Sequence, residues 1–321
     1  DVVQVVLDST PFYGEGGGQV GDRGSLSGVD VIVAIDSVSR SRDVFVHSGR
    51  MERGHLAVGD TVKAQVDRSC RRRAQANHTA THLLQAALKQ VVDPGIGQAG
   101  SLVDFDRLRF DFHCSTAVTA EQLAQIETLI NGWIAEAHSL QVQEMAIDQA
   151  KAAGAVAMFG EKYADVVRVV DVPGVSMELC GGTHVANTAE IGLFKIVAES
   201  GVAAGIRRIE AVAGPAVLAY LNERDAVVKQ LGDRFKAQPA EIVDRVAALQ
   251  EELKATGKAL AAAQAELAVA KAGALVAKAE AMGEFQLLVE RLDGVDGAGL
   301  QGAAQSLADQ LGDGAAVVIG G

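Results

Sequence analysis

The stretch RRRAQANHTATHLLQAALKQVV, residues 71–92, contains the clearest helix pattern of the chain and two histidines within it. It contains neither glycine nor proline, and Pro94-Gly95 follows it, so it predicts a helix that ends before Pro94. His78 and His82 stand four residues apart within it, and this spacing places both imidazoles on one face of the helix. Two imidazoles on one face can bind the same metal ion.

A second pair of metal-binding residue types lies in Cys180-Gly-Gly-Thr-His184. The Gly-Gly step lets the thiolate and the imidazole turn toward one point, and Cys and His are ligands that zinc prefers. Each pair alone is also compatible with residues that bind nothing, but together they predict one metal site with His78 and His82. A zinc peptidase is excluded, because Thr79 stands where the H-E-x-x-H motif requires Glu.

A glycine-rich run occupies residues 13–22, YGEGGGQVGD. Three consecutive glycines let the backbone approach a ligand closely. The run is not a phosphate-binding P-loop, because no Lys-Ser or Lys-Thr follows. The alternative is a flexible hairpin with no ligand.

Composition bounds the remaining possibilities. A length of 321 residues predicts two or three domains, and a formal net charge of −12 gives no general affinity for nucleic acid. The basic run of Arg68 and Arg71 to Arg73 is either a local phosphate contact or a solvated helix start. Three cysteines without regular spacing do not form a disulfide framework. With no signal-peptide pattern and no long apolar stretch, the chain is expected to be cytoplasmic, without membrane association.

Four segments differ in pattern, and the expected fold class is α+β. Residues 1–67 carry short β-branched runs between turns and predict a small β-barrel. Residues 68–215 add the helix already described, strands, and a second helix at 119–137 that begins with a capping box of Thr119 and Gln122. The expected strands lie around residues 101–112, 140–147, 166–172 and 191–213.

The remaining segments are helical and then α/β. Residues 216–283 predict a helical hairpin or a coiled coil for association, with Pro239 at a helix start. Residues 284–321 predict the start of a C-terminal α/β domain. The heptad seam consists of Ile242, Val246, Leu249, Leu253, Thr256, Leu260, Ala263, Leu267 and Ala270.

Several motifs taken together resemble one family. They are LDSTPFYGEGGGQVGDRG, NHTATHLLQAAL, GQAGSLV at 97–103, LRFDF at 108–112 and MELCGGTHVANTAEIGLFKI. As a set they resemble the editing domain of alanyl-tRNA synthetases, and the later segments are similar to the family's C-terminal domain. The family's adenylation motifs are missing, so the resemblance implies part of a longer protein, without ligase activity of its own.

The resemblance implies a function and a site. The function is hydrolysis of mischarged Ser-tRNA(Ala) and Gly-tRNA(Ala), with tRNA(Ala) as partner and homodimerisation through the helical region. One Zn²⁺ would be held by His78, His82, Cys180 and His184. Cys180, His78, His82 and Gln98 would serve catalysis, and the substrate would contact Gly16, Gly17, Gly18, Gln19, Gln98 and Thr81. The alternative is a non-catalytic, zinc-stabilised module for tRNA binding and dimerisation, since four protein ligands complete a tetrahedral site.

Overall fold

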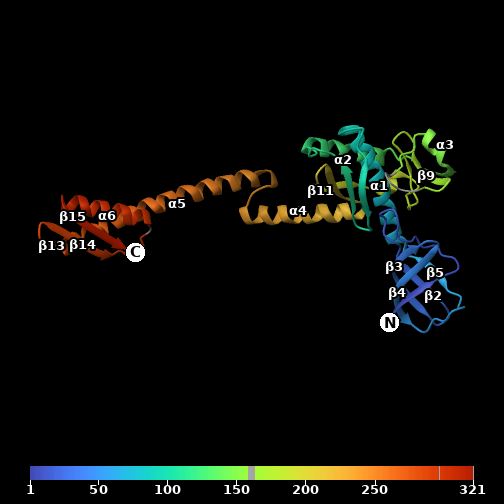
Figure 1. Cartoon of the computed structure of the whole chain (residues 1–321), viewed down its shortest axis with the longest axis horizontal. Coiled ribbons are helices and arrows are strands. Elements are labelled where there is room, and N and C mark those ends of the chain that lie inside the picture. Colours follow the sequence, from blue (N-terminus) through green and yellow to red (C-terminus); the bar gives the residue numbers. More distant parts are fainter. Residues whose placement is uncertain (158–162, 296, 321) are drawn as a thin grey trace. The chain divides into compact units, whose positions relative to one another are not determined.

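A computed structural model describes residues 1–157, 163–295 and 297–320 of the chain (Figure 1). The chain divides into two compact units, Asp1–Arg224 and Asp225–Gly321, and each is described by itself. In the parts that the structure describes, no helix has the length and apolar character needed to cross a membrane.

The N-terminal strands form one open antiparallel sheet rather than the predicted barrel. Strands β1 (Val2–Val6), β2 (Gly24–Ser27), β3 (Ile32–Ser41), β4 (Val44–Arg53) and β5 (Lys63–Val66) follow the order β1-β4-β3-β2-β5. A barrel requires the first and last strands of this order to pair. Among the described residues β1 and β5 do not pair and remain at opposite edges. The core of this sheet is small, and its buried members are Phe12, Leu26, Val31, Val33, Ile35 and Val38.

The glycine-rich run forms a tight hairpin turn against the neighbouring sheet. Gly16 and Gln19 exchange backbone hydrogen bonds of 3.1 and 3.0 Å, and Gly17 and Gly18 between them both have positive φ. This is the two-residue turn that glycine favours. A Cβ on Gly18 would lie 2.7 Å from the carbonyl oxygen of Ser101, so the close approach also requires glycine. The run therefore forms a hairpin whose turn requires glycine at positions 17 and 18.

The main core lies between two helices and a four-stranded sheet. Helices α1 (Arg68–Val91) and α2 (Ala120–Ala135) pack against each other and against the sheet β11-β12-β7-β6 (Figure 1). Its strands are β6 (Gln98–Val103), β7 (Leu108–His113), β11 (Phe194–Ala203) and β12 (Ile206–Ala213). The Asp67 carboxylate caps α1, and the capping box of Thr119 and Gln122 is confirmed.

A third sheet lies in the sequence between α2 and the strands β11 and β12 of the main core. It has the order β10-β9-β8, formed by β8 (Gln141–Ala146), β9 (Val166–Val172) and β10 (Ser176–Leu179). The short helix α3 (Ile147–Ala152) and the short strand β10 have no counterpart among the predicted elements. Because β10 ends at Leu179, it sets the position of Cys180, and the turn η1 (Thr188–Ile191) follows.

The C-terminal segments are helical as far as Gly273 and then α/β, and the strand β13 lies within the stretch 216–283 that was predicted to be helical. Helices α4 (Pro215–Phe235) and α5 (Ile242–Gly273), with the short η2 (Pro239–Glu241) between them, precede η3 (Val276–Lys278) and the strand β13 (Glu280–Met282). Strands β14 (Phe285–Arg291) and β15 (Ala315–Gly320) are parallel and joined through α6 (Gly297–Leu311). The heptad leucines of α5 are exposed, with Leu253 at 75% and Leu260 at 58%, so pairing of this helix stays a prediction.

Candidate metal centre

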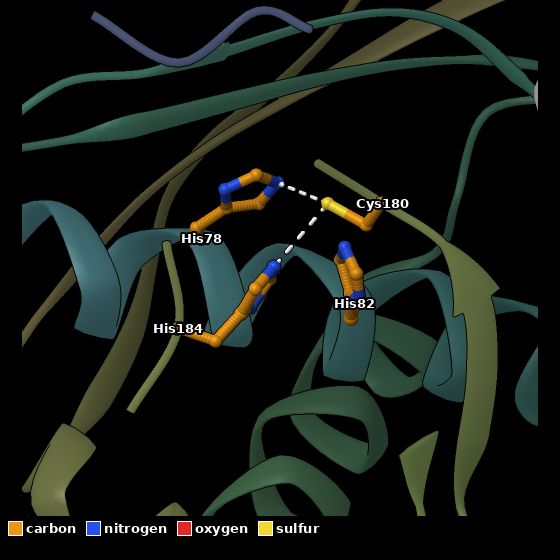
Figure 2. A group of neighbouring side chains, drawn as sticks. All are labelled: His78, His82, Cys180 and His184. Atoms are coloured by element: carbon orange, nitrogen blue, oxygen red, sulfur yellow. Dashed lines mark hydrogen bonds between the residues drawn. The ribbon is translucent and has the colours of Figure 1, made fainter. Parts of the chain in front are cut away.

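The two predicted ligand pairs converge on one point (Figure 2). His78 and His82 lie one turn apart on α1, and Cys180 and His184 lie in the loop after β10. The Cys180 Sγ is 3.4 Å from the Nε2 of His78 and 3.2 Å from the Nε2 of His184. The four ligand atoms all lie within 4.8 Å of one another. The sequence prediction that these residues come together is therefore confirmed.

The side chain of Arg168 holds the backbone of the loop that carries Cys180. The Arg168 guanidinium donates hydrogen bonds of 2.7 and 2.9 Å to the carbonyl oxygens of Cys180 and Gly182. A Cβ on Gly182 would lie 2.0 Å from the Cε1 of His78. The loop can therefore approach α1 this closely only with glycine at position 182.

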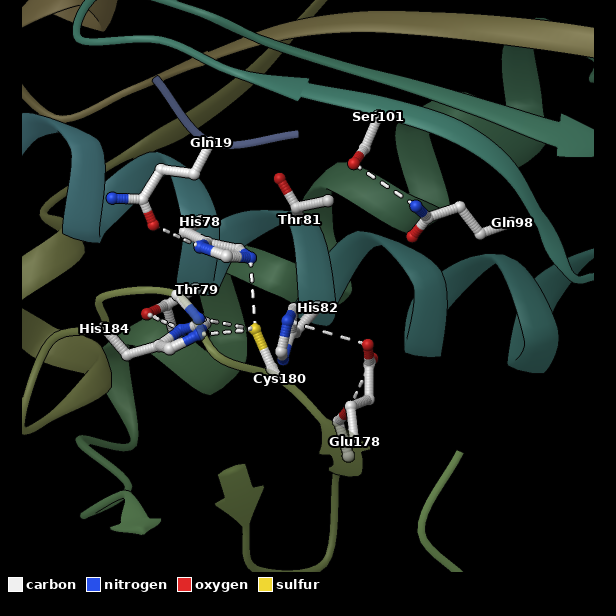
Figure 3. A network of polar contacts seen from close by, with 12 residues as sticks. Gln19, His78, Thr79, Thr81, His82, Gln98, Ser101, Glu178, Cys180 and His184 are labelled. Carbon is white, nitrogen blue, oxygen red and sulfur yellow. Dashed lines mark hydrogen bonds and ion pairs between the residues drawn. The ribbon is translucent and has the colours of Figure 1, made fainter. Parts of the chain in front are cut away.

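Three polar side chains orient the imidazoles from outside the cluster (Figure 3). The Gln19 Oε1 lies 2.7 Å from the Nδ1 of His78, and the Thr79 hydroxyl lies 3.1 Å from the Nδ1 of His184. A carboxylate oxygen of Glu178 lies 3.6 Å from the Nε2 of His82. Such partners fix the ring orientation and tautomer of metal-binding histidines.

The sequence predictions did not include these orienting roles. Gln19 was expected to contact substrate, but it is fully buried, and it also bonds both the backbone N–H and the hydroxyl of Thr183. From the sequence, Thr79 was used only as evidence against a zinc peptidase. No role was predicted for Glu178 or Arg168. A carboxylate two residues before Cys180 was a signal available in the sequence.

The electrostatics of the cluster favour a thiolate. Burial opposes ionisation of Cys180, but His78, together with hydrogen bonds from His184 and His82, outweighs it and holds the pKa of the thiol well below its ordinary value. Burial and the neighbouring His78 lower the pKa of His184 to about 3, so this imidazole is neutral. Burial also lowers the pKa of His82, but Glu178 and Cys180 outweigh it and raise the pKa to about 9.

The donor set fits a zinc ion. One thiolate and three imidazoles are the atoms that zinc prefers, and four of them match its tetrahedral coordination. His78 and His184 both present Nε2 to the sulfur while their Nδ1 atoms have partners in the protein. The proton that His82 holds would be released on metal binding, as is usual for such sites.

A pocket of about 580 Å³ opens above the cluster. Of the predicted substrate residues, Gly16, Gly17, Thr81 and Gln98 line it, whereas Gly18 and Gln19 do not. The Gln98 amide donates a hydrogen bond of 3.2 Å to the Ser101 hydroxyl. Other lining residues were not among the predicted site residues, and they include Tyr13, Arg40, Phe45 and Arg71. Tyr13 lies in the glycine-rich run and Arg71 in the basic run, whereas nothing in the local pattern marks Arg40 or Phe45.

The basic run at the start of α1 is held within the fold. Arg71 pairs with the buried Asp22, and Arg73 pairs with Asp106. Arg72 lies 3.7 Å from Glu190 in a more exposed pair. These ion pairs favour a structural role for the three arginines over a dedicated phosphate-binding patch.

Sequence comparisons match two regions of the chain to tRNA synthetases. Residues 167–210, which include Cys180 and His184, match the threonyl and alanyl tRNA synthetase second additional domain. Residues 1–70 match the class II (A) tRNA synthetases. These two matches place the matched regions in the class of class II tRNA synthetases.

The similar proteins specify the family. The chain is 98% identical over its whole length to an alanine–tRNA ligase of Parasynechococcus marenigrum (strain WH8102), and 92% identical to that of Synechococcus sp. (strain CC9605). It is 79% identical to the alanine–tRNA ligase of Prochlorococcus marinus (strain MIT 9303). The chain belongs to the alanine–tRNA ligase family, and it spans 36% of the length of these three relatives.

Proposed function

We propose that this chain is an editing module that hydrolyses the ester bond of mischarged Ser-tRNA(Ala) and Gly-tRNA(Ala). The observation that carries the proposal is the buried cluster of one cysteine and three histidines at the base of a pocket, in a member of the alanine–tRNA ligase family. A synthetic site for alanine cannot exclude the smaller glycine, and serine differs by one hydroxyl. Binding alone discriminates such pairs only about a hundredfold, so a second, hydrolytic site is needed.

In this proposal each side chain has a distinct task. His78, His82, Cys180 and His184 hold one Zn²⁺, which would supply Lewis-acid stabilisation or an acidified water. Gln19, Thr79 and Glu178 keep the imidazoles oriented.

The pocket wall orients the amino acid of the substrate in the same proposal. Thr81 and Gln98 line the pocket that opens over the metal ligands. The Gln98 amide sits beside the Ser101 hydroxyl, where a seryl hydroxyl can join the same hydrogen-bond network.

The alternative is a zinc-stabilised module that binds tRNA and dimerises without catalysis. The observation in its favour is that four protein ligands complete a tetrahedral zinc shell and leave no open position. A catalytic role for the metal then requires a ligand to be displaced, or the coordination to expand, during the reaction. Hydrolysis measurements separate the two proposals.

The test is deacylation of Ser-tRNA(Ala) by the purified, zinc-loaded chain. We expect hydrolysis by the parent and a loss of at least about a hundredfold in Cys180→Ala, because the thiolate is part of the metal shell. Cys114→Ala is the matched control, since the Cys114 Sγ bonds to Thr116 within its own turn and does not belong to the metal cluster. Zinc content and circular dichroism accompany each assay, because loss of metal can unfold such domains. A zinc-loaded parent that binds tRNA but does not hydrolyse the ester supports the alternative.

A further inference from the structure

A second pocket shares two lining residues with the pocket above the metal cluster. Its volume is about 370 Å³, which is within the range of small-molecule sites. Gln98 and Glu178 line both pockets and therefore stand between them (Figure 3). The other residues that line the second pocket include Gln85, Lys89 and His113. The metal chemistry of the proposed function uses none of these three.

Helix α1 supplies residues to both pockets from one face. His78, His82, Gln85 and Lys89 follow one another at steps of four, three and four, so their side chains lie along one stripe of the helix. His78 and His82 line the pocket above the cluster, and the other two line the second pocket. Lys89 stands about two turns, or about 10 Å along the axis, beyond His82. The second pocket is therefore distinct from the metal shell, but it is reached along the same helix face.

Gln85 is a buried polar side chain with unused capacity for hydrogen bonding. It is only 4% exposed, and its amide makes no hydrogen bond within the part of the chain that the structure describes. Buried polar side chains nearly always have a partner. Because Gln85 lines the second pocket, a polar ligand there can be that partner.

Lys89 and Glu178 bring opposite charges to the second pocket without neutralising each other. Among the described residues the half-buried Lys89 forms no ion pair, either with Glu178 or with another carboxylate. Glu178 accepts a hydrogen bond of 2.9 Å from the Ser176 hydroxyl, and its other oxygen lies 3.6 Å from the Nε2 of His82. A carboxylate has about four acceptor sites, so Glu178 can accept a further cationic donor. The pocket thus offers a cation and an anion to one ligand.

Hydrolysis of an aminoacyl ester produces a molecule with the matching pair of charges. Water gives its hydroxyl to the acyl carbon and its proton to the ribose oxygen, and the acid then loses a proton to solvent. The released amino acid therefore has both an ammonium and a carboxylate, whereas the ester has the ammonium alone. Lys89 consequently attracts the product and not the substrate.

We infer that the second pocket binds the free serine or glycine that hydrolysis releases, with its ammonium at Glu178 and its carboxylate at Lys89. The inference rests on the proposed function, because the amino acid must come from an ester at the metal cluster. A separate product site lets the amino acid leave the metal ligands while the tRNA still fills the first pocket.

The position of Lys89 also allows a purely structural role, which the experiment must separate. Lys89 lies in the last turn of α1, where a cation complements the negative end of the helix dipole. Lys151 lies in the last turn of α3 in the same way and does not line the second pocket. Lys151→Ala is therefore the matched control.

Binding of free L-serine to the zinc-loaded chain, measured by NMR titration, tests the inference. The comparison ligand is L-serinamide, which keeps the ammonium but has no carboxylate. Lys89→Ala is expected to weaken L-serine on the order of tenfold and to leave L-serinamide unchanged. Lys89→Arg and Lys151→Ala are expected to bind L-serine as the parent does. The side-chain amide signals of Gln85, assigned by their loss in Gln85→Leu, are expected to shift when L-serine is added.

Hydrolysis of Ser-tRNA(Ala) is measured separately. Lys89 does not touch the ester, so the rate of the first turnover should be the same in the parent and in Lys89→Ala. Free L-serine should inhibit Lys89→Ala less than it inhibits the parent.

Equal affinity of the parent and Lys89→Ala for L-serine overturns the inference, because serine is then held elsewhere, for example at the metal. An equal loss in Lys151→Ala, or L-serine binding that leaves the Gln85 signals unshifted, overturns it as well. L-serine binding with the expected pattern in a chain that does not hydrolyse the ester overturns the proposed function instead. The two failures are distinguished, since one is measured by affinity and the other by turnover.

Discussion

Gly182→Ala directly tests whether the four-residue cluster is a metal site whose geometry depends on the close approach of the loop. The new Cβ would lie 2.0 Å from Cε1 and 2.3 Å from Nδ1 of His78, and 2.9 Å from the Gln19 Oε1. Ordinary contact begins at 3.4 Å, so one partner must move by 3.4 − 2.0 = 1.4 Å. The loop resists this movement, because Arg168 holds the carbonyl oxygens of Cys180 and Gly182.

The imidazole of His78 therefore moves, and a metal ligand tolerates displacements of only about 0.2 Å. Removal of an orienting partner alone costs about 10- to 100-fold in metal affinity, so displacement of the ligand together with Gln19 should cost at least about a hundredfold. Overpacking should also lower the free energy of unfolding by about 1–3 kcal/mol.

Zinc affinity, measured by competition with a chromophoric chelator, checks this expectation. Gly181→Ala is the neighbouring control, because a Cβ there meets no atom within 4 Å. Parental zinc affinity in Gly182→Ala would show that His78 is not a ligand, or that the loop does not approach α1 in the manner described.

Three further predictions follow from other parts of the chain. Gln98→Ala should lower the ratio of Ser-tRNA to Ala-tRNA hydrolysis. The effect should be less than about tenfold, because the Gln98 amide keeps its hydrogen bond to Ser101 when no seryl hydroxyl is present. An unchanged ratio would show that other residues determine the selectivity. Burial lowers the pKa of His47 below its ordinary value of 6.5, despite a hydrogen bond to the Val5 carbonyl. The unfolded chain therefore takes up the proton first, and stability should fall as the pH drops below about 6.5. Urea unfolding at two pH values should show this loss, and the loss should be smaller in His47→Gln, because the lowered pKa of His184 contributes to it as well. The exposed seam of α5 predicts a dimer in analytical ultracentrifugation that the double variant Leu253→Glu, Leu260→Glu dissociates; a monomeric parent would contradict this.

Local patterns predicted the elements that carry the metal cluster. The i, i+4 spacing of His78 and His82 and the short Cys180–His184 motif depend only on neighbouring residues, and both pairs lie as expected. The capping box of α2 was likewise predictable from Thr119 and Gln122. Each of these features is a property of a few consecutive residues, so a single sequence contains the information.

Contacts between distant segments were not predictable in the same way. The bond between Gln19 and His78 joins residues 59 positions apart, and no periodicity marks it. Closure of the N-terminal sheet was predicted wrongly because strand patterns indicate how many strands exist, but not whether β1 meets β5. Tyr13 and Arg40 were missed for the same reason, since their common pocket is lined by residues from three distant segments, the glycine-rich run, α1 and the loop after β10.

The distance in sequence between the two ligand pairs has a consequence for folding during synthesis on the ribosome. Cys180 follows His78 by 102 residues, so at about 5–20 residues per second the histidine pair is synthesised roughly 5–20 seconds before its sulfur ligand. During that interval α1 can form, but it can offer a metal ion only two imidazoles. The nascent chain therefore cannot complete the four-ligand shell until the third sheet has been made and β10 has delivered Cys180, which makes loading of the metal a late step of folding rather than its nucleus.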